Sequence, residues 1–420
     1  MWIGAVYVFS GVAIISTMKQ NFTKDTVSKE DIRPADWLDS IILKGVSMRA
    51  SDIHIEPSED GIRTFFRIDG VLNHVDSLPI EYHEAIISRL KVSANLDTTE
   101  HRKPQDGHIL FPSKIPNQGS IDLRLSVFPS ILGETAVLRI LNRADLLFEN
   151  LDNLGISPDE MEKLKEILHQ HSGMILVTGP SGSGKTTTLY TMLGYLVSRS
   201  SGRENIVTLE DPVELRLRNI RQAQIFPEIG FDFVQGLRSI LRQDANIIMV
   251  GEIRDDETVR ISLRAALTGV LFLSTMHTLN SVGAIIRFTE LGVPRSLVAS
   301  ALRLVIAQRL VRTLCTHCKV QANFSKRWVE TFGIAEEDRE KIFDSKGCDQ
   351  CLNTGYLGRI GIFELLFIDK EIQESIIESR SFTEVEELAN KKIKQTLRDA
   401  AVKKVLEGVT TFEEITRVVW

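Results

Sequence analysis

Gly179-Pro-Ser-Gly-Ser-Gly-Lys-Thr186 is the stretch of sequence on which the interpretation of the whole chain depends. It matches the phosphate-loop pattern G-x-x-x-x-G-K-[ST] at every fixed position. An apolar run at 174–178 precedes it and a helical pattern at 185–197 follows, which is the context that the motif requires. A Gly- and Ser-rich turn without a ligand would not explain the complete motif in this context. The stretch therefore predicts a nucleotide-binding loop.

The residue types in this loop suit the binding of Mg-ATP. Glycines let the backbone curl so that several N–H groups point at phosphate, and the positive end of the following helix adds to the attraction. Lys185 is expected to reach the β- and γ-phosphates, and the Thr186 hydroxyl is expected to coordinate Mg²⁺. The residues expected to hold ATP are Gly179, Pro180, Ser181, Gly182, Ser183, Gly184, Lys185, Thr186 and Thr187.

Strand and helix patterns alternate on both sides of the loop, which predicts a parallel sheet covered by helices. The strands are continuous apolar runs, as expected where both faces of a sheet are buried. The first helix has Pro158 and two acids in its first turn, which are start signals. The expected strands are 174–178, 205–210, 247–250 and 271–275, and the expected helices are 158–171, 185–197, 233–243, 257–267 and 281–291.

Hydrolysis of a bound nucleotide also needs a carboxylate near the γ-phosphate. Glu252 follows the apolar run 247–250, and ligands gather at the carboxyl ends of strands in open α/β sheets. Gly251 stands where an Asp usually ends this strand, so Glu252 acts alone or with a helper. Glu210, in the acidic segment 208–214, is the candidate helper. Such a segment by itself is more often a solvated acidic loop, and its place between the phosphate loop and Glu252 favours the functional interpretation.

His277 follows the apolar run 271–275. Its imidazole is a candidate sensor of the γ-phosphate through a hydrogen bond. A lone histidine is more often structural, so this assignment depends on the neighbouring motifs.

All four cysteines lie close together in the sequence, as Cys315-x-x-Cys318 and Cys348-x-x-Cys351 separated by 29 residues. Two C-x-x-C pairs supply four thiolates that can close a tetrahedron around Zn²⁺. Two disulfides are the rival interpretation, which a reducing compartment disfavours. The pattern predicts one structural zinc site without an open catalytic position.

The beginning of the chain is unusually apolar, because residues 1–18 contain no charged side chain. The segment is just long enough to be considered as a membrane anchor, and Lys19 and Lys24 would keep the rest of the chain cytoplasmic. A buried β-rich segment and a misassigned start are the alternatives. No basic stretch precedes the apolar run, which argues against a signal peptide. Residues 19–36 are polar and are interpreted as a linker.

The region up to residue 150 shows hairpins and one clear helix, which predicts a small mixed sheet domain. Its expected strands are 61–68, 71–76, 120–128 and 135–141, with Asp69-Gly70 as a two-residue hairpin turn and a helix at 82–94. Residues 356–420 are expected to be mainly helical. Their expected core positions are Ile372, Ile376, Ile377, Leu388, Ile393 and Leu397.

The composition is that of an ordinary globular protein, with 43% hydrophobic residues, 25% charged residues and a net charge of −6. Surfaces that bind nucleic-acid phosphates usually show a basic excess, so no nucleic-acid partner is expected. A nucleotide-dependent DNA-binding module or DNA translocase is therefore kept only as the less supported class of function.

The ordered motifs resemble the secretion ATPases of type II secretion and type IV pilus assembly. The resemblance extends from about Ser47 to the C-terminus and rests on five segments in the family's order. The cysteine quartet favours assembly ATPases over the retraction type, and its spacing looks most like the type II secretion ATPase. The segments are R-A-S-D-I-H-I-E-P at 49–57, the phosphate loop, E-D-P-V-E at 210–214, G-E-I-R-D at 251–255 and S-T-M-H at 274–277.

This resemblance implies an ATP-hydrolysing motor for protein export or pseudopilus assembly in a type II secretion system, with a type IV pilus-assembly ATPase as the alternative. Family members are cytoplasmic homo-hexamers that act at inner-membrane platform proteins, which implies peripheral association with the inner membrane. Their ATP sites lie between the N-terminal and phosphate-loop domains, where arginines approach the phosphates. By position these are Arg124 and Arg139, although either residue alone would be interpreted as an exposed strand position.

The expected fold class is α/β: a RecA-like phosphate-loop ATPase domain, a smaller N-terminal α/β domain, a four-cysteine zinc module and a helical C-terminal region. The expected segments are 1–18 as the apolar N-terminal segment, 19–45 as linker and start of the N-terminal domain, 46–150 as the N-terminal domain, 151–312 as the ATPase domain, 313–355 as the zinc module and 356–420 as the helical region.

Overall fold

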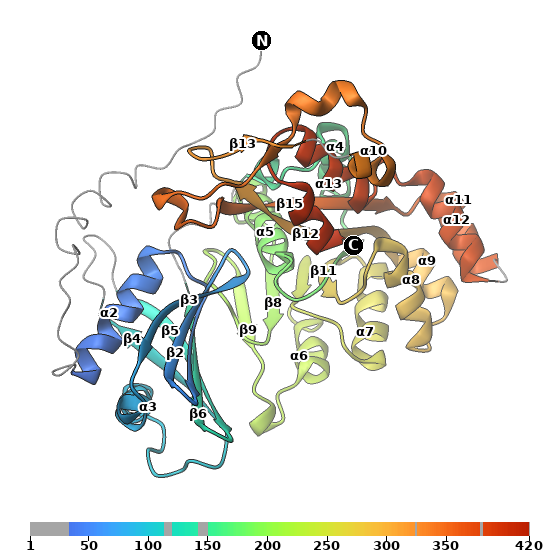
Figure 1. Cartoon of the computed structure of the whole chain (residues 1–420). Helices are drawn as coiled ribbons and strands as arrows, with labels where there is room; N and C mark the ends of the chain where they lie inside the picture. Colours follow the sequence, from blue (N-terminus) through green and yellow to red (C-terminus); the bar gives the residue numbers. More distant parts are fainter. Residues whose placement is uncertain (1–32, 113–119, 142–149, 324–325, 379–380, 420) are drawn as a thin grey trace. The chain divides into compact units, whose positions relative to one another are not determined.

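The computed structural model describes residues 33–112, 120–141, 150–323, 326–378 and 381–419. The chain divides into two units, Met1–Ile140 (unit 1) and Leu141–Trp420 (unit 2), shown in Figure 1 in blue to teal and in green to red. The apolar segment 1–18 and most of the expected linker lie outside the described residues. No helix in the described ranges is long and apolar enough to cross a membrane.

Unit 1 is built on a six-stranded sheet with the order β3-β2-β1-β6-β5-β4. Its core lies on one face of the sheet, where Ile42 of α2 and Ile86 and Leu90 of α3 pack against buried strand residues such as Ile53. The elements are α2 (Pro34–Ser47), β1 (Asp52–Ser58), β2 (Gly61–Ile68), β3 (Val71–Leu78), η1 (Ile80–Tyr82), α3 (His83–Ser93), β4 (Gln105–Phe111), β5 (Ile121–Ser130) and β6 (Gly133–Leu141).

Most predicted elements of unit 1 are confirmed to within two residues at each end. The hairpin turn is also confirmed, because Ile68 pairs with Val71 and both turn residues, Asp69 and Gly70, have positive φ. The linker interpretation is wrong for residues 34–36, since Pro34 is the first residue of α2. Proline is favoured there because a first-turn N–H has no partner within the helix. β1 and β4 were also not predicted.

Unit 2 contains a seven-stranded sheet with the order β15-β12-β7-β11-β10-β8-β9. Every pair of neighbours is parallel except β12 and β15, which are antiparallel. The strands are β7 (Gly173–Thr178), β8 (Ile206–Glu210), β9 (Arg221–Gln224), β10 (Ile247–Val250), β11 (Leu271–Met276), β12 (Leu302–Leu314) and β15 (Tyr356–Phe367), with β13 (Val320–Gln321) and β14 (Phe343–Asp344) as a separate pair.

Helices cover both faces of this sheet, as the alternating pattern predicted. One apolar cluster includes Leu193 of α5 and the other includes Leu263 of α7, and strand residues contribute to both. The helices are η2 (Leu151–Leu154), α4 (Pro158–Leu168), α5 (Lys185–Ser200), η3 (Pro227–Ile229), α6 (Phe233–Ile240), α7 (Asp256–Leu267), α8 (Ser281–Glu290), α9 (Arg295–Ala301), α10 (Lys326–Phe332), η4 (Glu336–Lys341), η5 (Asp349–Cys351), α11 (Lys370–Glu378), α12 (Phe382–Lys392), α13 (Leu397–Leu406) and α14 (Phe412–Val419).

The C-terminal region is helical from α11 onward, but its first part is the strand β15. That strand pairs along most of its length with β12, which was not predicted either. Ile377 was wrongly assigned to the core, because it is 48% exposed. Ile372 and Ile376 of the same helix are buried, so the apolar face of α11 is narrower than its run of isoleucines indicated.

Candidate functional site

The phosphate loop connects the buried strand β7 to helix α5, as the motif predicted. Gly184 is the N-cap of α5 with φ 88, and a Cβ atom there would lie 2.7 Å from Nε2 of Gln308. Gly179 has φ 150, and its Cβ would lie 2.4 Å from the Gln308 carbonyl oxygen. Both positions therefore exclude larger residues, which explains the fixed glycines of the motif.

Two side chains of the loop suit an anionic ligand. Lys185 is the first residue of α5, and its Nζ donates to the carbonyl oxygens of Gly179 and Pro180 at 2.8 and 3.0 Å. Burial lowers the pKa of Lys185 to about 8, with Glu252 opposing the shift and Arg309 adding to it. The Ser183 hydroxyl is buried without a hydrogen-bond partner among the described residues. An orphaned donor beside a cation fits a phosphate group.

The predicted acidic and histidine residues lie at the same edge of the sheet as this loop. β7, β11, β10 and β8 are consecutive parallel neighbours, so their carboxyl ends meet there. The phosphate loop follows β7, His277 follows β11, Glu252 follows β10, and Glu210 ends β8. Side chains join these ends: Thr275 Oγ1 donates to the Gly251 carbonyl oxygen at 2.7 Å. The edge brings the predicted site residues of unit 2 together.

Glu252 is the centre of a charged group at this edge. Its side chain is 18% exposed, it pairs with Arg254, and its Oε2 lies 3.7 Å from Nε2 of His277. Burial lowers the pKa of His277, and the charges of Lys185 and Arg254 lower it further against the opposing effect of Glu252. A neutral imidazole at this position can exchange hydrogen bonds with a bound phosphate. Arg254 was not predicted as part of the site.

Glu210 has a different environment, because its carboxylate is buried and already accepts several hydrogen bonds. Tyr190 Oη and Thr208 Oγ1 donate to it, and Gln222 Nε2 donates at 3.1 Å. Burial and the carboxylate raise the pKa of Tyr190. The carboxylate therefore ties α5 to the carboxyl end of β8 and to β9.

β12 also contributes to the phosphate loop, which sequence reasoning missed. Its pairing with β7 ends at Ala307 opposite Thr178, and the strand continues beside the loop. Gln308 accepts a hydrogen bond from Thr188 Oγ1 at 2.7 Å, and Arg309 is buried next to it. In the sequence, the polar residues Gln308 and Arg309 interrupt an apolar run, and this interruption was the signal that could have identified the segment.

In unit 1, Arg124 and Arg139 lie on the sheet face opposite α2 and α3. Along β5 and β6 the flanking residues, such as Leu123 and Leu138, are buried while both arginines are exposed. Arg139 Nε donates to Oδ1 of the buried Asp52 at 2.9 Å, and its side chain remains 59% exposed. Both strand positions leave the arginine side chains exposed, as the prediction from the sequence requires. Asp52 is a partner of Arg139 that the sequence did not reveal.

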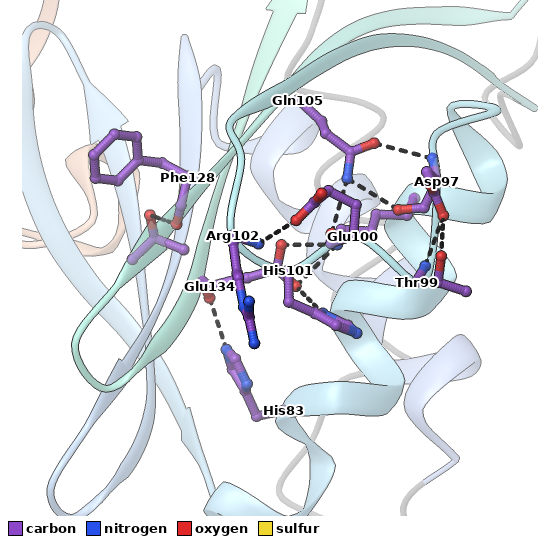
Figure 2. Close-up of polar contacts among 11 residues, drawn as sticks. His83, Asp97, Thr99, Glu100, His101, Arg102, Gln105, Phe128 and Glu134 are labelled. Carbon is purple, nitrogen blue, oxygen red and sulfur yellow. Dashed lines mark hydrogen bonds and ion pairs between the residues drawn. The ribbon is translucent and has the colours of Figure 1, made fainter.

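A second polar cluster of unit 1 fixes the loop between α3 and β4 (Figure 2). Lys91 is fully buried, and its Nζ lies 2.7 Å from Glu134 Oε1 and donates to the Glu100 carbonyl oxygen at 2.7 Å. His101 Nδ1 lies 2.8 Å from Glu134 Oε2, and His83 Nε2 lies 2.7 Å from the Glu134 carbonyl oxygen. Burial would raise the pKa of Glu134, but hydrogen bonds from Lys91 and His101 lower it. The cluster braces the loop against β6.

The four cysteines converge, as the spacing predicted. Their sulfur atoms lie within 4.8 Å of one another, at 3.9 Å for Cys315 and Cys348 and 3.7 Å for Cys318 and Cys351. A tetrahedron with Zn–S bonds of about 2.3 Å has sulfur separations of about 3.8 Å, so the geometry fits zinc. The backbone N–H groups of Cys348 and Gly355 donate to Cys351 Sγ at 3.2 Å. Such hydrogen bonds orient metal ligands.

The sequence matches the family described as "Type II/IV secretion system protein" over residues 28–417. It is 42% identical over 381 residues to "Type II secretion system protein E" of Xanthomonas campestris pv. campestris, covering 90% of this chain and 66% of the relative. The same-named protein of Pseudomonas aeruginosa is 41% identical over 398 residues, with 94% and 78% covered. "Type IV pilus assembly ATPase PilB" of Thermus thermophilus is 38% identical over 419 residues, with 97% and 46% covered. The chain therefore spans 46% to 78% of these relatives' lengths.

Solved structures show the same fold. The pilus retraction motor PilT with bound ADP superposes with a TM-score of 0.60 at 26% identity, covering 90% of this chain and 96% of that chain. The ATPase DotB of Legionella pneumophila superposes with a TM-score of 0.66 at 21% identity, covering 94% and 97%. The second likeness is one of fold alone.

Proposed function

Because the chain belongs to the type II/IV secretion system protein family, we propose that it is an ATP-hydrolysing motor of a type II secretion system. The motor powers protein export or assembly of the pseudopilus. The observation that supports this most directly is the sheet edge of unit 2, where the phosphate loop, Glu252 and His277 follow three neighbouring parallel strands.

The residues of this edge divide the work of hydrolysis. The backbone of residues 179–187 and the Lys185 ammonium hold the ATP phosphates, and the Thr186 hydroxyl is a ligand for Mg²⁺, which neutralises phosphate charge when bound. Glu252 orients the attacking water and accepts its proton, and His277 senses the γ-phosphate by a hydrogen bond. Glu210, at the end of β8, assists by holding α5 in place through the hydrogen bond that it accepts from Tyr190.

We propose further that Arg124 and Arg139 of unit 1 contact the ATP phosphates during hydrolysis. Both are exposed on the sheet face opposite α2 and α3, so their guanidinium groups are accessible. An arginine fork stays charged and can grip two phosphate oxygens at once.

The four cysteines hold one structural Zn²⁺ ion. Zinc would fix the connection between β12 and β15, the two strands that Cys315 follows and Cys351 precedes. Four thiolate ligands leave no open position for a substrate, so the metal has no catalytic part.

The working form is a homo-hexamer on the cytoplasmic side of the inner membrane, in contact with platform proteins of the secretion machine. Relatives named as pilus-assembly ATPases are about as similar, at 38% to 40% identity, as relatives named type II secretion system protein E. A pilus-assembly ATPase is therefore the second candidate, with the same site and mechanism.

A chromosomal Lys185→Ala allele tests the function and separates the two candidates. In the host of this gene, the allele should stop export of secreted enzymes while pili persist, and ATP turnover by the purified wild-type chain should rise when the platform protein is added. Loss of pili with normal export would assign the chain to pilus assembly. Normal export and normal pili together would refute the proposed motor.

A further inference from the structure

We propose that Arg309 is a second cation of the nucleotide site, buried beside the phosphate loop, which positions the loop and attracts the phosphates through it. The inference rests on the proposed function and extends it to a residue of β12. It assigns to Arg309 a positioning role, because the side chain acts through the loop rather than by direct contact with the reacting atoms.

The side chain of Arg309 lies directly behind the first glycine of the loop. Arg309 is 7% exposed, and a Cβ atom built on Gly179 would lie 3.1 Å from its Nη1. Nη1 donates to the Gln308 carbonyl oxygen at 2.9 Å, and Nη2 donates to the Leu279 carbonyl oxygen at 2.6 Å. Leu279 belongs to the segment that follows His277, so Arg309 connects the phosphate loop with the histidine side of the site.

This cation has no ion-pair partner in the described part of the chain. Its hydrogen bonds go to backbone carbonyl oxygens, and no carboxylate forms an ion pair with it there. The negative charge of Glu364 favours the charged form of Arg309. The oxygens of Glu364, however, accept hydrogen bonds from Ser281 and from the Leu397 N–H. Burial lowers the pKa of Arg309.

A buried charge without a direct ion-pair partner is costly, and an anion that arrives on binding removes part of that cost. The polyphosphate of ATP is such an anion, and the loop that binds it is in contact with Arg309. Because the electrostatic attraction grows with phosphate charge, Arg309 should matter more for ATP than for ADP and least for AMP.

Arg303 provides a matched control on the same strand. Its guanidinium also donates to backbone carbonyl oxygens, those of Ser300 and Leu302, and it packs against Gly173 at the start of β7. Arg309 packs against Gly179 after the end of β7. Both arginines of β12 donate to backbone carbonyl oxygens, but Arg303 is only partly buried and packs at the other end of β7 from the phosphate loop.

The test measures the affinities of Mg-ATP, Mg-ADP and AMP by calorimetry for full-length wild type, Arg309→Gln, Arg309→Lys and Arg303→Gln. Arg309→Gln should weaken ATP binding about tenfold or more, the scale for one charge a few ångströms from a phosphate, and weaken ADP less and AMP least. Arg309→Lys should restore most of the ATP affinity, and Arg303→Gln should match wild type. If the glutamine variant does not fold, Arg309→Met provides an uncharged side chain of similar length.

Three results would overturn the inference: an uncharged Arg309 variant that binds ATP as wild type does, equal losses for all three nucleotides, or an Arg309→Lys variant as weak as the uncharged ones. Each can occur while wild type binds and hydrolyses ATP and Lys185→Ala does not. If wild type itself bound no nucleotide, the proposed function would fail instead, so the two failures are distinguishable.

Discussion

Replacement of Glu252 by Gln isolates the catalytic part of the site from its binding part. Glutamine keeps the shape of the side chain, and its Oε1 can still accept the hydrogen bond from Arg254 that the structure shows. The negative charge and the ability to accept a proton are lost. The phosphate loop, which lies after a different strand, is unchanged.

The size of the effect follows from the position of Glu252. It is 18% exposed and has His277 3.7 Å away, so the substitution removes a positioned and mostly buried acid/base group. Losing such a group reduces turnover by about 10² to 10⁴, which is about 2.7–5.4 kcal/mol of activation free energy. ATP affinity should stay the same or rise, because a negative charge near the phosphates has been removed.

The assay is phosphate release under saturating Mg-ATP, together with binding of ATP to the same preparations. Glu257→Gln is the matched control, because Glu257 also pairs with an arginine, Arg238, but lies on α7 with a half-exposed side chain. The control should turn over ATP like wild type. If Glu252→Gln hydrolysed ATP at the wild-type rate, the assignment of Glu252 as the catalytic base of the site would be wrong.

Three further predictions concern the other parts of the chain. Purified protein should contain about one Zn²⁺ per chain, and Cys315→Ser should lower zinc content and thermal stability together while ATP binding survives; metal-free protein with unchanged melting would contradict this. Arg124→Ala and Arg139→Ala should each lower turnover by about 10³ with most ATP affinity kept, whereas near-neutral turnover would leave unit 1 as a docking module. Lys91→Met should destabilise unit 1 by about 3–5 kcal/mol, because it leaves the buried Glu134 carboxylate without its cation. The folded-state pKa of Glu134 lies below its ordinary 4.5. The ionised carboxylate therefore stabilises unit 1 fully above pH 4.5, and this stabilisation disappears as the pH falls through the lowered pKa. Acid unfolding of Glu134→Gln should lack this pH-dependent loss of stability.

Elements that are specified by residues close together in the sequence were predictable. The phosphate loop, the Asp69-Gly70 turn and the buried strands of unit 2 each depend on residues within a few positions of one another. A turn that needs positive φ and a strand buried on both faces leave a recognisable pattern in composition. These elements were sufficient to place Glu252 and His277 beside the loop, because parallel strands share one carboxyl edge.

The remainder depends on contacts between distant parts of the chain. Arg139 meets Asp52 from 87 residues away, and Lys91 meets Glu134 from 43 residues away. β12 and β15 pair with each other although the cysteine segment separates them in the sequence. Neither strand shows the alternation of apolar and polar residues that would distinguish it from a helix. No local pattern encodes such partners, so the contact of Arg309 with the phosphate loop and the hydrogen bond from Tyr190 to Glu210 became visible only in the folded chain.

The central claim is that the loop at 179–186 binds ATP for hydrolysis. Steady-state phosphate release by full-length wild type and Lys185→Ala, at equal concentration with Mg-ATP, tests it most directly. The account predicts turnover by wild type and a loss of both ATP binding and turnover in the variant, because Nζ of Lys185 is the cation of the loop. Turnover by Lys185→Ala at the wild-type rate, or no turnover by wild type with or without its platform partner, would contradict it.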